Sequence, residues 1–241
     1  MMADSDRAAH FDGFLSPSLA WLKAAAIAFA LLAFPLHART VHAAPVAAEA
    51  HVYLVRGVLN IFSLGMDEIA ARLQRQGITA TVHNHMMWAS IADDAAAEYR
   101  SGRAKMIILV GHSSGATCLP DIVERLDQHG VPVKLAIGLD SVFHTSLSGR
   151  VGRYINFYVA NGAGTRVERA KNFSGTLENV DVEAVPGVGH LTIDKNEVIQ
   201  EKVIAAIDAA VFGRPRVAPA TGRPPAPARQ ASGPKRAAAA N

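Results

Sequence analysis

A single cysteine, Cys118, is present among the 241 residues, which excludes an internal disulfide bond. The longest uninterrupted apolar run, Ala24–Leu36, has 13 residues and is short for a membrane-spanning helix. No internal repeat is present in the sequence. Half of the residues are hydrophobic and 19% are charged, which is the composition of a globular protein, and the length suits one domain with appendages.

Acidic residues are missing from the C-terminal segment 213–241, which carries six basic side chains and is rich in proline and alanine. Residues 1–44 hold three basic and three acidic side chains, so residues 45–212 have a net charge of −3. Basicity is therefore a property of the tail, and the main body offers no basic groove for nucleic acid. We expect 213–241 to be a disordered tail that either contacts anionic envelope surfaces weakly or is a solvated extension.

The N-terminal segment has the pattern of an export signal. Arg7 and Lys23 precede the apolar run Ala24–Leu36, and Val41–Ala43 offers a small-residue cleavage site. We expect residues 1–44 to be a signal peptide cleaved near Ala43, with an uncleaved N-terminal anchor as the alternative. The mature protein is then exported to the periplasm or secreted.

Residues 45–212 form the expected folded domain, in which strands alternate with helices. The predicted strands are short apolar or alternating runs: His51–Val55, Ile78–His83, Met106–Val110, Val133–Leu139, Tyr154–Ala160 and Val180–Val185. The predicted helices are Met66–Gln76, Ala89–Arg103, Ala116–His129 and Asp194–Phe212. This order predicts an α/β fold, a three-layer sandwich with a mostly parallel six-stranded sheet. In such sheets, ligand chemistry belongs at the carboxyl ends of the strands.

The sequence Gly111-His112-Ser113-Ser114-Gly115 matches G-x-S-x-G and lies between a predicted strand and a predicted helix. Its two glycines let the backbone turn sharply, so that the Ser113 hydroxyl stands above the sheet. This context predicts a nucleophile elbow with Ser113 as the nucleophile, because Ser114 has no glycine two residues before it. A glycine-rich turn that only packs closely is the alternative.

A serine hydroxyl needs a base to remove its proton and an acid to orient that base. Asp140 ends the predicted strand Val133–Leu139, and His190 lies in the loop after the last predicted strand. Ser113, Asp140 and His190 each follow a different strand, and so we predict that they meet at one edge of the sheet as a catalytic triad. Asp140 could instead cap the turn after its strand.

Other residues compete for the roles of acid and base. Asp181 begins a predicted strand, which would direct it to the opposite edge, and His144 lies in an expected surface loop. His83 and His85 could line the pocket or bind a metal, but an H-x-H pair without a further ligand favours a structural role, and no metal site is predicted. Cys118 is expected to be a small buried hydrophobe.

An oxyanion hole needs two backbone N–H groups that face the developing alkoxide. Ser114, which follows the nucleophile, is expected to supply one of them. The second is expected from the loop after the first strand, from Gly57 or Val58.

The connections near the expected site are too short to hold a helical cap domain. There are 13 residues between Asp140 and Tyr154 and 19 between Ala160 and Val180. The expected rim of the open cleft is apolar and has no cluster of Arg or Lys; it includes Val142, Phe143, Asn161–Thr165 and Leu191. This composition predicts neutral acyl esters or thioesters as substrates.

The elbow, the order Ser113, Asp140, His190 and the Arg56-Gly57 loop resemble the α/β-hydrolase superfamily, especially its small exported bacterial lipase-like or thioesterase-like members. The resemblance covers about residues 51–212. It implies acyl transfer to water through an acyl-enzyme on Ser113, with no metal or organic cofactor. An acid that follows the fourth strand, as Asp140 does, resembles only a lipase-like subset of this superfamily. The sequence also lacks the two antiparallel strands that open many full-sized members, and in this it resembles a minimal, cutinase-like core.

We therefore expect a serine hydrolase that cleaves carboxylic esters or thioesters of small molecules. Two alternatives remain from the sequence alone. Some proteins of this fold are inactive and serve as binding or scaffold proteins of the cell envelope, and others are acyltransferases.

Overall fold

The computed structural model describes residues 46–58 and 60–213, so the predicted signal segment and nearly all of the predicted tail lie outside the described residues. The strands are β1 (Ala50–Arg56), β2 (Thr79–Asn84), β3 (Met106–His112), β4 (Val133–Leu139), β5 (Thr145–Leu147), β6 (Arg150–Tyr158), β7 (Val167–Arg169) and β8 (Ser174–Asp181). The helices are η1 (Val46–Glu49), α2 (Gly65–Arg75), η2 (His85–Met87), α3 (Trp88–Ser101), α4 (Ser114–Thr117), α5 (Leu119–Gln128) and α6 (Glu197–Phe212).

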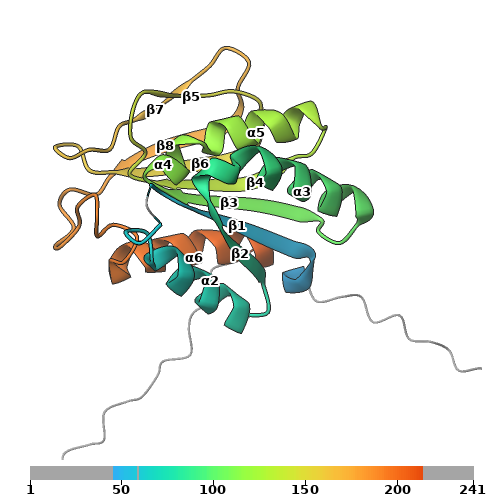
Figure 1. Ribbon diagram of the computed structural model, residues 1–241, viewed down its shortest axis with the longest axis horizontal. Helices are drawn as coiled ribbons and strands as arrows, with labels where there is room; N and C mark the ends of the chain where they lie inside the picture. The colour runs from blue at the N-terminus through green and yellow to red at the C-terminus, as the bar shows by residue number, and fades with distance from the viewer. Residues whose placement is uncertain (1–45, 59, 214–241) are drawn as a thin grey trace, which may run out of the picture. The chain divides into compact units, whose positions relative to one another are not determined.

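Six of the strands form one sheet in the order β2-β1-β3-β4-β6-β8, and every neighbouring pair in it is parallel. Helices α3 and α5 cover one face, and α2 and α6 cover the other (Figure 1). The predicted three-layer α/β fold is therefore confirmed, and it agrees with the resemblance to the α/β-hydrolase superfamily.

The central strands are apolar throughout because both of their faces are buried. On β1, Val52 and Leu54 pack in the core on the side of α2 and α6, whereas Tyr53 and Val55 pack on the side of α3 and α5. Full burial of an aliphatic side chain of this size stabilises the fold by about 1.5–3 kcal/mol. The two cores fix the sheet and hold the carboxyl ends of its strands in place.

The last two connections between strands of the main sheet contain short strands in place of helices. β5 and β7 pair in parallel as a separate two-stranded sheet. Leu147 and Val167, one from each strand, are buried in the core on the α5 side. The sequence predicts loops at both positions, because strands of three residues leave no periodic pattern.

The prediction of the last strand is wrong. β8 covers Ser174–Asp181, not Val180–Val185, and the residues after Asp181 form a turn closed by a bond from the N–H of Val185 to the carbonyl of Val182. β8 is the edge strand and is only partly buried, so it lacks the apolar run that marks a central strand. Its final residue, Asp181, therefore lies at the carboxyl edge of the sheet.

Several other boundaries differ from the predictions by a few residues; α6, for example, begins at Glu197 and not at Asp194. The helix predicted over Ala116–His129 is divided at Cys118 into α4 and α5, with Pro120 in the first turn of α5. Proline lacks an N–H and is tolerated there because the first turn has no internal acceptor for it. The strand predicted over Tyr154–Ala160 is the longer β6, Arg150–Tyr158.

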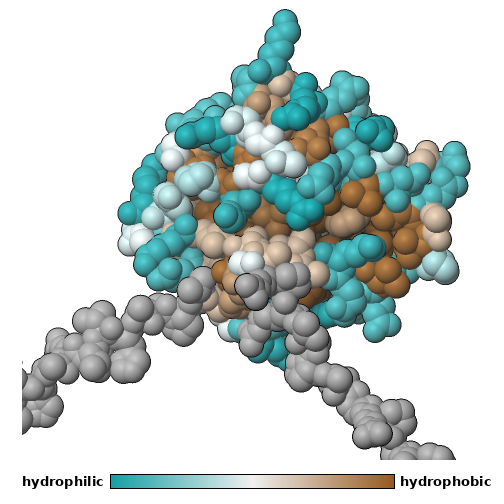
Figure 2. Space-filling view, turned by 180° about the vertical axis from the view of Figure 1, so that it is seen from behind, coloured by the Kyte–Doolittle hydropathy of each residue, from teal (hydrophilic) through white to brown (hydrophobic). Residues whose placement is uncertain are grey.

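Hydrophobic surface remains on the side of the sheet where α6 meets the edge strand. A shallow groove of about 420 Å³ is lined there by residues of β6, β8 and α6, which are apolar except for Arg153, Glu178 and Lys202. Figure 2 shows the molecule from behind, where hydrophobic side chains are exposed between hydrophilic ones. No helix in the part of the chain that the structure describes is long and apolar enough to cross a membrane.

Candidate active site

Ser113 lies in the sharp turn between β3 and α4, with φ 57° and ψ −124°. Such a backbone conformation is strained for any residue with a side chain. The flanking glycines are required, because a Cβ on Gly111 would lie 2.4 Å from the carbonyl oxygen of Gly115, and one on Gly115 would lie 2.2 Å from that of Val55. The strand, strained turn and helix predicted from the motif are all present.

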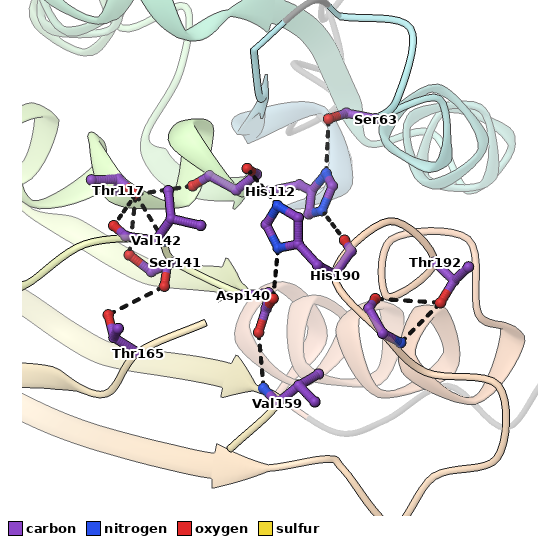
Figure 3. A network of polar contacts seen from close by, with 12 residues as sticks. Ser63, His112, Thr117, Asp140, Ser141, Val142, Val159, Thr165, His190 and Thr192 are labelled. Carbon is purple, nitrogen blue, oxygen red and sulfur yellow. Dashed lines mark hydrogen bonds and ion pairs between the residues drawn. The ribbon is translucent and has the colours of Figure 1, made fainter. Parts of the chain in front are cut away.

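The three predicted residues form one hydrogen-bonded line. Ser113 Oγ lies 3.0 Å from His190 Nε2. His190 Nδ1 lies 2.6 Å from Asp140 Oδ2 (Figure 3). The side chain of His190 is 25% exposed, whereas that of Asp140 is completely buried. The hydroxyl and the imidazole are therefore accessible from outside, and the carboxylate is enclosed behind them.

The Asp140 carboxylate is fixed by groups on its other side. Its Oδ1 atom accepts the N–H of Val159 at 2.8 Å, and its own N–H donates to the carbonyl of Phe157 at 2.7 Å. Gly164 packs so closely that a Cβ there would lie 1.8 Å from Asp140 Oδ1. Because Asp140 can only accept from His190 Nδ1–H, the neutral imidazole presents its Nε2 lone pair to the Ser113 hydroxyl.

The loop that carries His190 is held by a neighbouring threonine. Thr192 Oγ1 donates to the carbonyl of Gly187 at 2.8 Å and accepts the N–H of Gly189 at 2.9 Å. Gly187 has φ 75°, a conformation that glycine adopts without strain. These bonds order the turn just before the imidazole.

The competing acid and base are not part of this line. The prediction that Asp181 lies at the opposite edge is wrong, because this residue ends β8 at the carboxyl edge. Its exposed carboxylate accepts the N–H groups of Ala160 and Glu183 and so caps a turn. His144 is exposed and lies 3.5 Å from the Glu168 carboxylate.

His83, the first residue of the H-x-H pair, has a structural setting. His83 Nε2 lies 2.7 Å from Thr81 Oγ1, and burial lowers the pKa of this imidazole, as does the neighbouring His51. Among the described residues, no group of three or more His, Cys, Asp or Glu side chains could hold a metal ion. Cys118 is buried, which raises the pKa of its thiol to about 12.

The loop after β1 lies directly against the serine. A Cβ on Gly57 would lie 2.9 Å from Ser113 Cβ, so this close approach requires glycine. The N–H of Gly57, however, donates to Ser63 Oγ at 3.0 Å, so of the two predicted donors in this loop Val58 is the one that the geometry favours. The N–H groups of Val58 and of Ser114, the first residue of α4, remain the predicted donors.

A cavity of about 180 Å³ opens beside the Ser113 hydroxyl. Its lining comes from the loop after β1, the elbow and the His190 loop: Gly57, Val58, Phe62, Ser63, His112, Ser113, His190 and Leu191. The apolar side chains of this lining are exposed, with Leu191 54%, Val58 53% and Phe62 42% exposed, whereas Val142 and Phe143 of the expected rim do not line the cavity. The turn 161–165 does not line the cavity but packs behind the acid, through Gly164 against Asp140.

Ser63 and His112 belong to this site but were not predicted from the sequence. Both side chains are 1% exposed, and Ser63 Oγ lies 2.8 Å from His112 Nδ1 (Figure 3). The signal that could have identified His112 is its position, because a polar residue that ends a buried apolar strand must find hydrogen-bond partners.

No protein-family model matches this chain, and no curated protein sequence matches it. Among solved structures, the chain is similar to the esterase domain of a Rhodothermus marinus protein, at 14% identity over 72% of this chain and 87% of that chain, with a TM-score of 0.42. It is also similar to an acetyl xylan esterase, at 14% identity over 68% of this chain and 99% of that chain, with a TM-score of 0.40. A third similar structure is that of a protein of unknown function from Agrobacterium tumefaciens, at 15% identity over 70% of this chain and 94% of that chain, with a TM-score of 0.44. The likeness to these proteins is one of fold alone.

Proposed function

We propose that this protein is a serine hydrolase of the α/β-hydrolase fold that cleaves carboxylic ester or thioester bonds through an acyl-enzyme on Ser113. The observation that carries the proposal is the line from Ser113 Oγ to His190 Nε2 at 3.0 Å and from His190 Nδ1 to Asp140 Oδ2 at 2.6 Å, with the hydroxyl at the mouth of a cavity. This order of hydroxyl, imidazole and carboxylate activates a serine for attack on an acyl carbon.

In the first half of the reaction, Ser113 Oγ attacks the carbonyl carbon while His190 Nε2 takes the hydroxyl proton. The imidazolium that forms is stabilised by the Asp140 carboxylate, which stays ionised. When the tetrahedral intermediate collapses, the bond to the alcohol or thiol breaks, and His190 returns its proton to that leaving group. In the second half, water replaces the hydroxyl as the nucleophile, and the acid is released with Ser113 restored.

The negative oxygen of the intermediate needs two N–H donors, for which Ser114 and Val58 are the candidates. The Gly57 backbone supports this assignment because it lies against Ser113 and brings the following residue to the same place. Loss of one such donor typically raises the barrier by about 2.7–4 kcal/mol.

The surroundings of the cavity favour a neutral, apolar acyl group. Exposed Leu191, Val58 and Phe62 offer apolar contact beside the hydroxyl. Lys195, which is near the cavity, donates from Nζ to the carbonyls of Phe62 and Leu191 at 2.8 Å. Its charge is therefore directed at the two loops rather than at a substrate carboxylate or phosphate.

The test is labelling of the protein with a fluorophosphonate probe, followed by turnover of p-nitrophenyl and CoA esters of increasing chain length. We expect wild type to be labelled and to release p-nitrophenol, and both activities to be lost in Ser113→Ala and His190→Ala. A folded wild type that is neither labelled nor active would contradict the proposal and favour an inactive binding protein. Transfer of the acyl group to an added alcohol in preference to water would identify an acyltransferase.

A further inference from the structure

His112, the residue just before the nucleophile, joins three segments of the chain around Ser113. Its Nδ1 atom lies 2.8 Å from Ser63 Oγ, and its Nε2 atom lies 2.8 Å from the carbonyl oxygen of His190 (Figure 3). Ser63 Oγ in turn accepts the N–H of Gly57 at 3.0 Å. The bonds run from the loop after β1, through the elbow, to the loop that carries the base.

The donor and the acceptor of each of these hydrogen bonds follow from one group, the carbonyl of His190. The carbonyl of His190 can only accept, so His112 Nε2 carries the hydrogen and donates it. In the neutral imidazole, Nδ1 is then an acceptor, and the Ser63 hydroxyl must donate to it. The lone pairs of Ser63 Oγ remain for the N–H of Gly57, so all donors and acceptors are matched.

The neutral form of His112 suits its surroundings. Its side chain is 1% exposed, and burial lowers the pKa of the imidazole, while the nearby Asp194 opposes that shift. Asp194 itself is committed elsewhere, since its Oδ2 atom accepts the N–H of Gly65 at 2.9 Å. That bond fastens the far end of the loop after β1 to the segment that follows His190.

We propose that Ser63 and His112 are positioning residues for the proposed hydrolysis: their hydrogen bonds set the backbone of Gly57–Val58 and of His190 relative to the Ser113 hydroxyl. The inference rests on the proposed function of Ser113. Both side chains border the cavity but are almost completely buried, so they act through the backbone that they hold. The oxyanion donor and the base matter most in the transition state, so the effect falls on kcat rather than on KM.

The test measures the acylation burst with p-nitrophenyl butyrate, the rate of fluorophosphonate labelling, and KM, in wild type and four variants. In Ser63→Ala the loop after β1 loses its acceptor, and we expect acylation to slow by about 10- to 100-fold with KM changed less than threefold. His112→Gln can still donate to the His190 carbonyl, and His112→Asn can still accept from Ser63. Each should therefore lose less than His112→Ala, which loses both links.

The matched control is His51→Gln, which alters another buried histidine, with hydrogen bonds at both ring nitrogens, on β1. Its acylation rate should equal that of wild type even where its stability falls as far as that of His112→Gln. Wild-type rates in Ser63→Ala, a change in KM alone, or an equal loss in His51→Gln would overturn the positioning role and leave the proposed hydrolase intact. A wild type that is not labelled at all would remove the proposed function and this inference with it.

Discussion

Two regions of the molecule hold a carboxylate, an imidazole and a hydroxyl in a row. In the Ser113 line, Asp140, His190 and Ser113 are joined by contacts of 2.6 and 3.0 Å. In what we call the Thr81 line, Glu98, His51 and Thr81 are joined by contacts of 2.6 and 2.9 Å. Hydrogen-bond distances therefore do not distinguish the two, and other features must decide which hydroxyl is a candidate nucleophile.

The backbone and the surroundings of the hydroxyl make that difference. Thr81 lies within β2 in regular register with β1, and its hydroxyl is held between the rings of His51 and His83. Ser113 lies in a strained turn at the carboxyl end of β3, beside a cavity and before the first N–H groups of α4. A nucleophilic hydroxyl needs space for an acyl group beside it and N–H donors for the negative oxygen that forms on that group. The surroundings of Ser113 provide both.

The largest expected effect separates the two hydroxyls. Ser113→Ala should lower kcat/KM for a p-nitrophenyl ester by about 10⁴- to 10⁶-fold, the range found when the nucleophile of such a triad is removed. Thr81→Val, which removes the other hydroxyl at nearly constant volume, should leave kcat/KM within about twofold, because ordinary surface and strand positions do not enter the reaction. Similar losses in both variants would mean that the comparison is wrong.

The two acids should respond differently to neutralisation. Asp140→Asn should lower kcat by about 10⁴-fold, since the amide favours the wrong imidazole tautomer. Glu98→Gln should keep the wild-type kcat but lower the free energy of unfolding by about 1–3 kcal/mol, because His51 and Tyr53 lose a charged acceptor. Steady-state kinetics of both variants measures kcat, and urea denaturation measures the free energy of unfolding. An inactive Glu98→Gln would show that the Thr81 line takes part in the reaction.

Acidification should affect both regions in the same sense. Burial lowers the pKa of His112 and of His83, so the unfolded chain, with histidine pKa near 6.5, binds protons that the folded chain does not. The stability from each neutral imidazole is complete above about pH 6.5 and is lost as the pH falls toward the lower folded pKa, at up to about 1.4 kcal/mol per pH unit.

We therefore expect that, as the pH is lowered, the free energy of unfolding decreases more steeply in wild type than in His112→Gln or His83→Gln. The titratable groups near His112 are Asp194, Asp140 and His190, and those near His83 are His51, Asp94 and Glu98. Denaturation curves between pH 5 and pH 8 test this directly. Equal slopes in wild type and both variants would contradict the assignment of neutral imidazoles.

The smallest expected effect concerns backbone strain. Because Ser113 has φ 57°, Ser113→Gly should be more stable than Ser113→Ala by about 1 kcal/mol, as glycine adopts this conformation without steric cost. At Thr81 the order should be reversed, since glycine weakens a regular strand by about 0.5–1 kcal/mol relative to alanine. Thermal unfolding of Ser113→Gly, Ser113→Ala, Thr81→Gly and Thr81→Ala shows which variant of each pair is the more stable. The same order at both positions would argue against strain at the elbow.

Much of the site could be predicted because the relevant signals are local. The glycines around Ser113 are needed by the turn itself, and the apolar runs of β3 and β4 reveal where the strands end. The edge strand β8 and the pair β5 and β7 could not be placed, because partly exposed or three-residue strands have no strong pattern. Misplacing β8 in turn placed Asp181 at the wrong edge.

The sequence by itself determined that Ser113, Asp140 and His190 would come together, since each follows a strand of a parallel sheet and the carboxyl ends of such strands share one edge. Only the tertiary structure decided that the Gly57 N–H is taken by Ser63 and that His112 holds the His190 backbone. These bonds join residues as many as 78 positions apart, in loops whose course depends on how both layers of helices pack, and no local pattern encodes them.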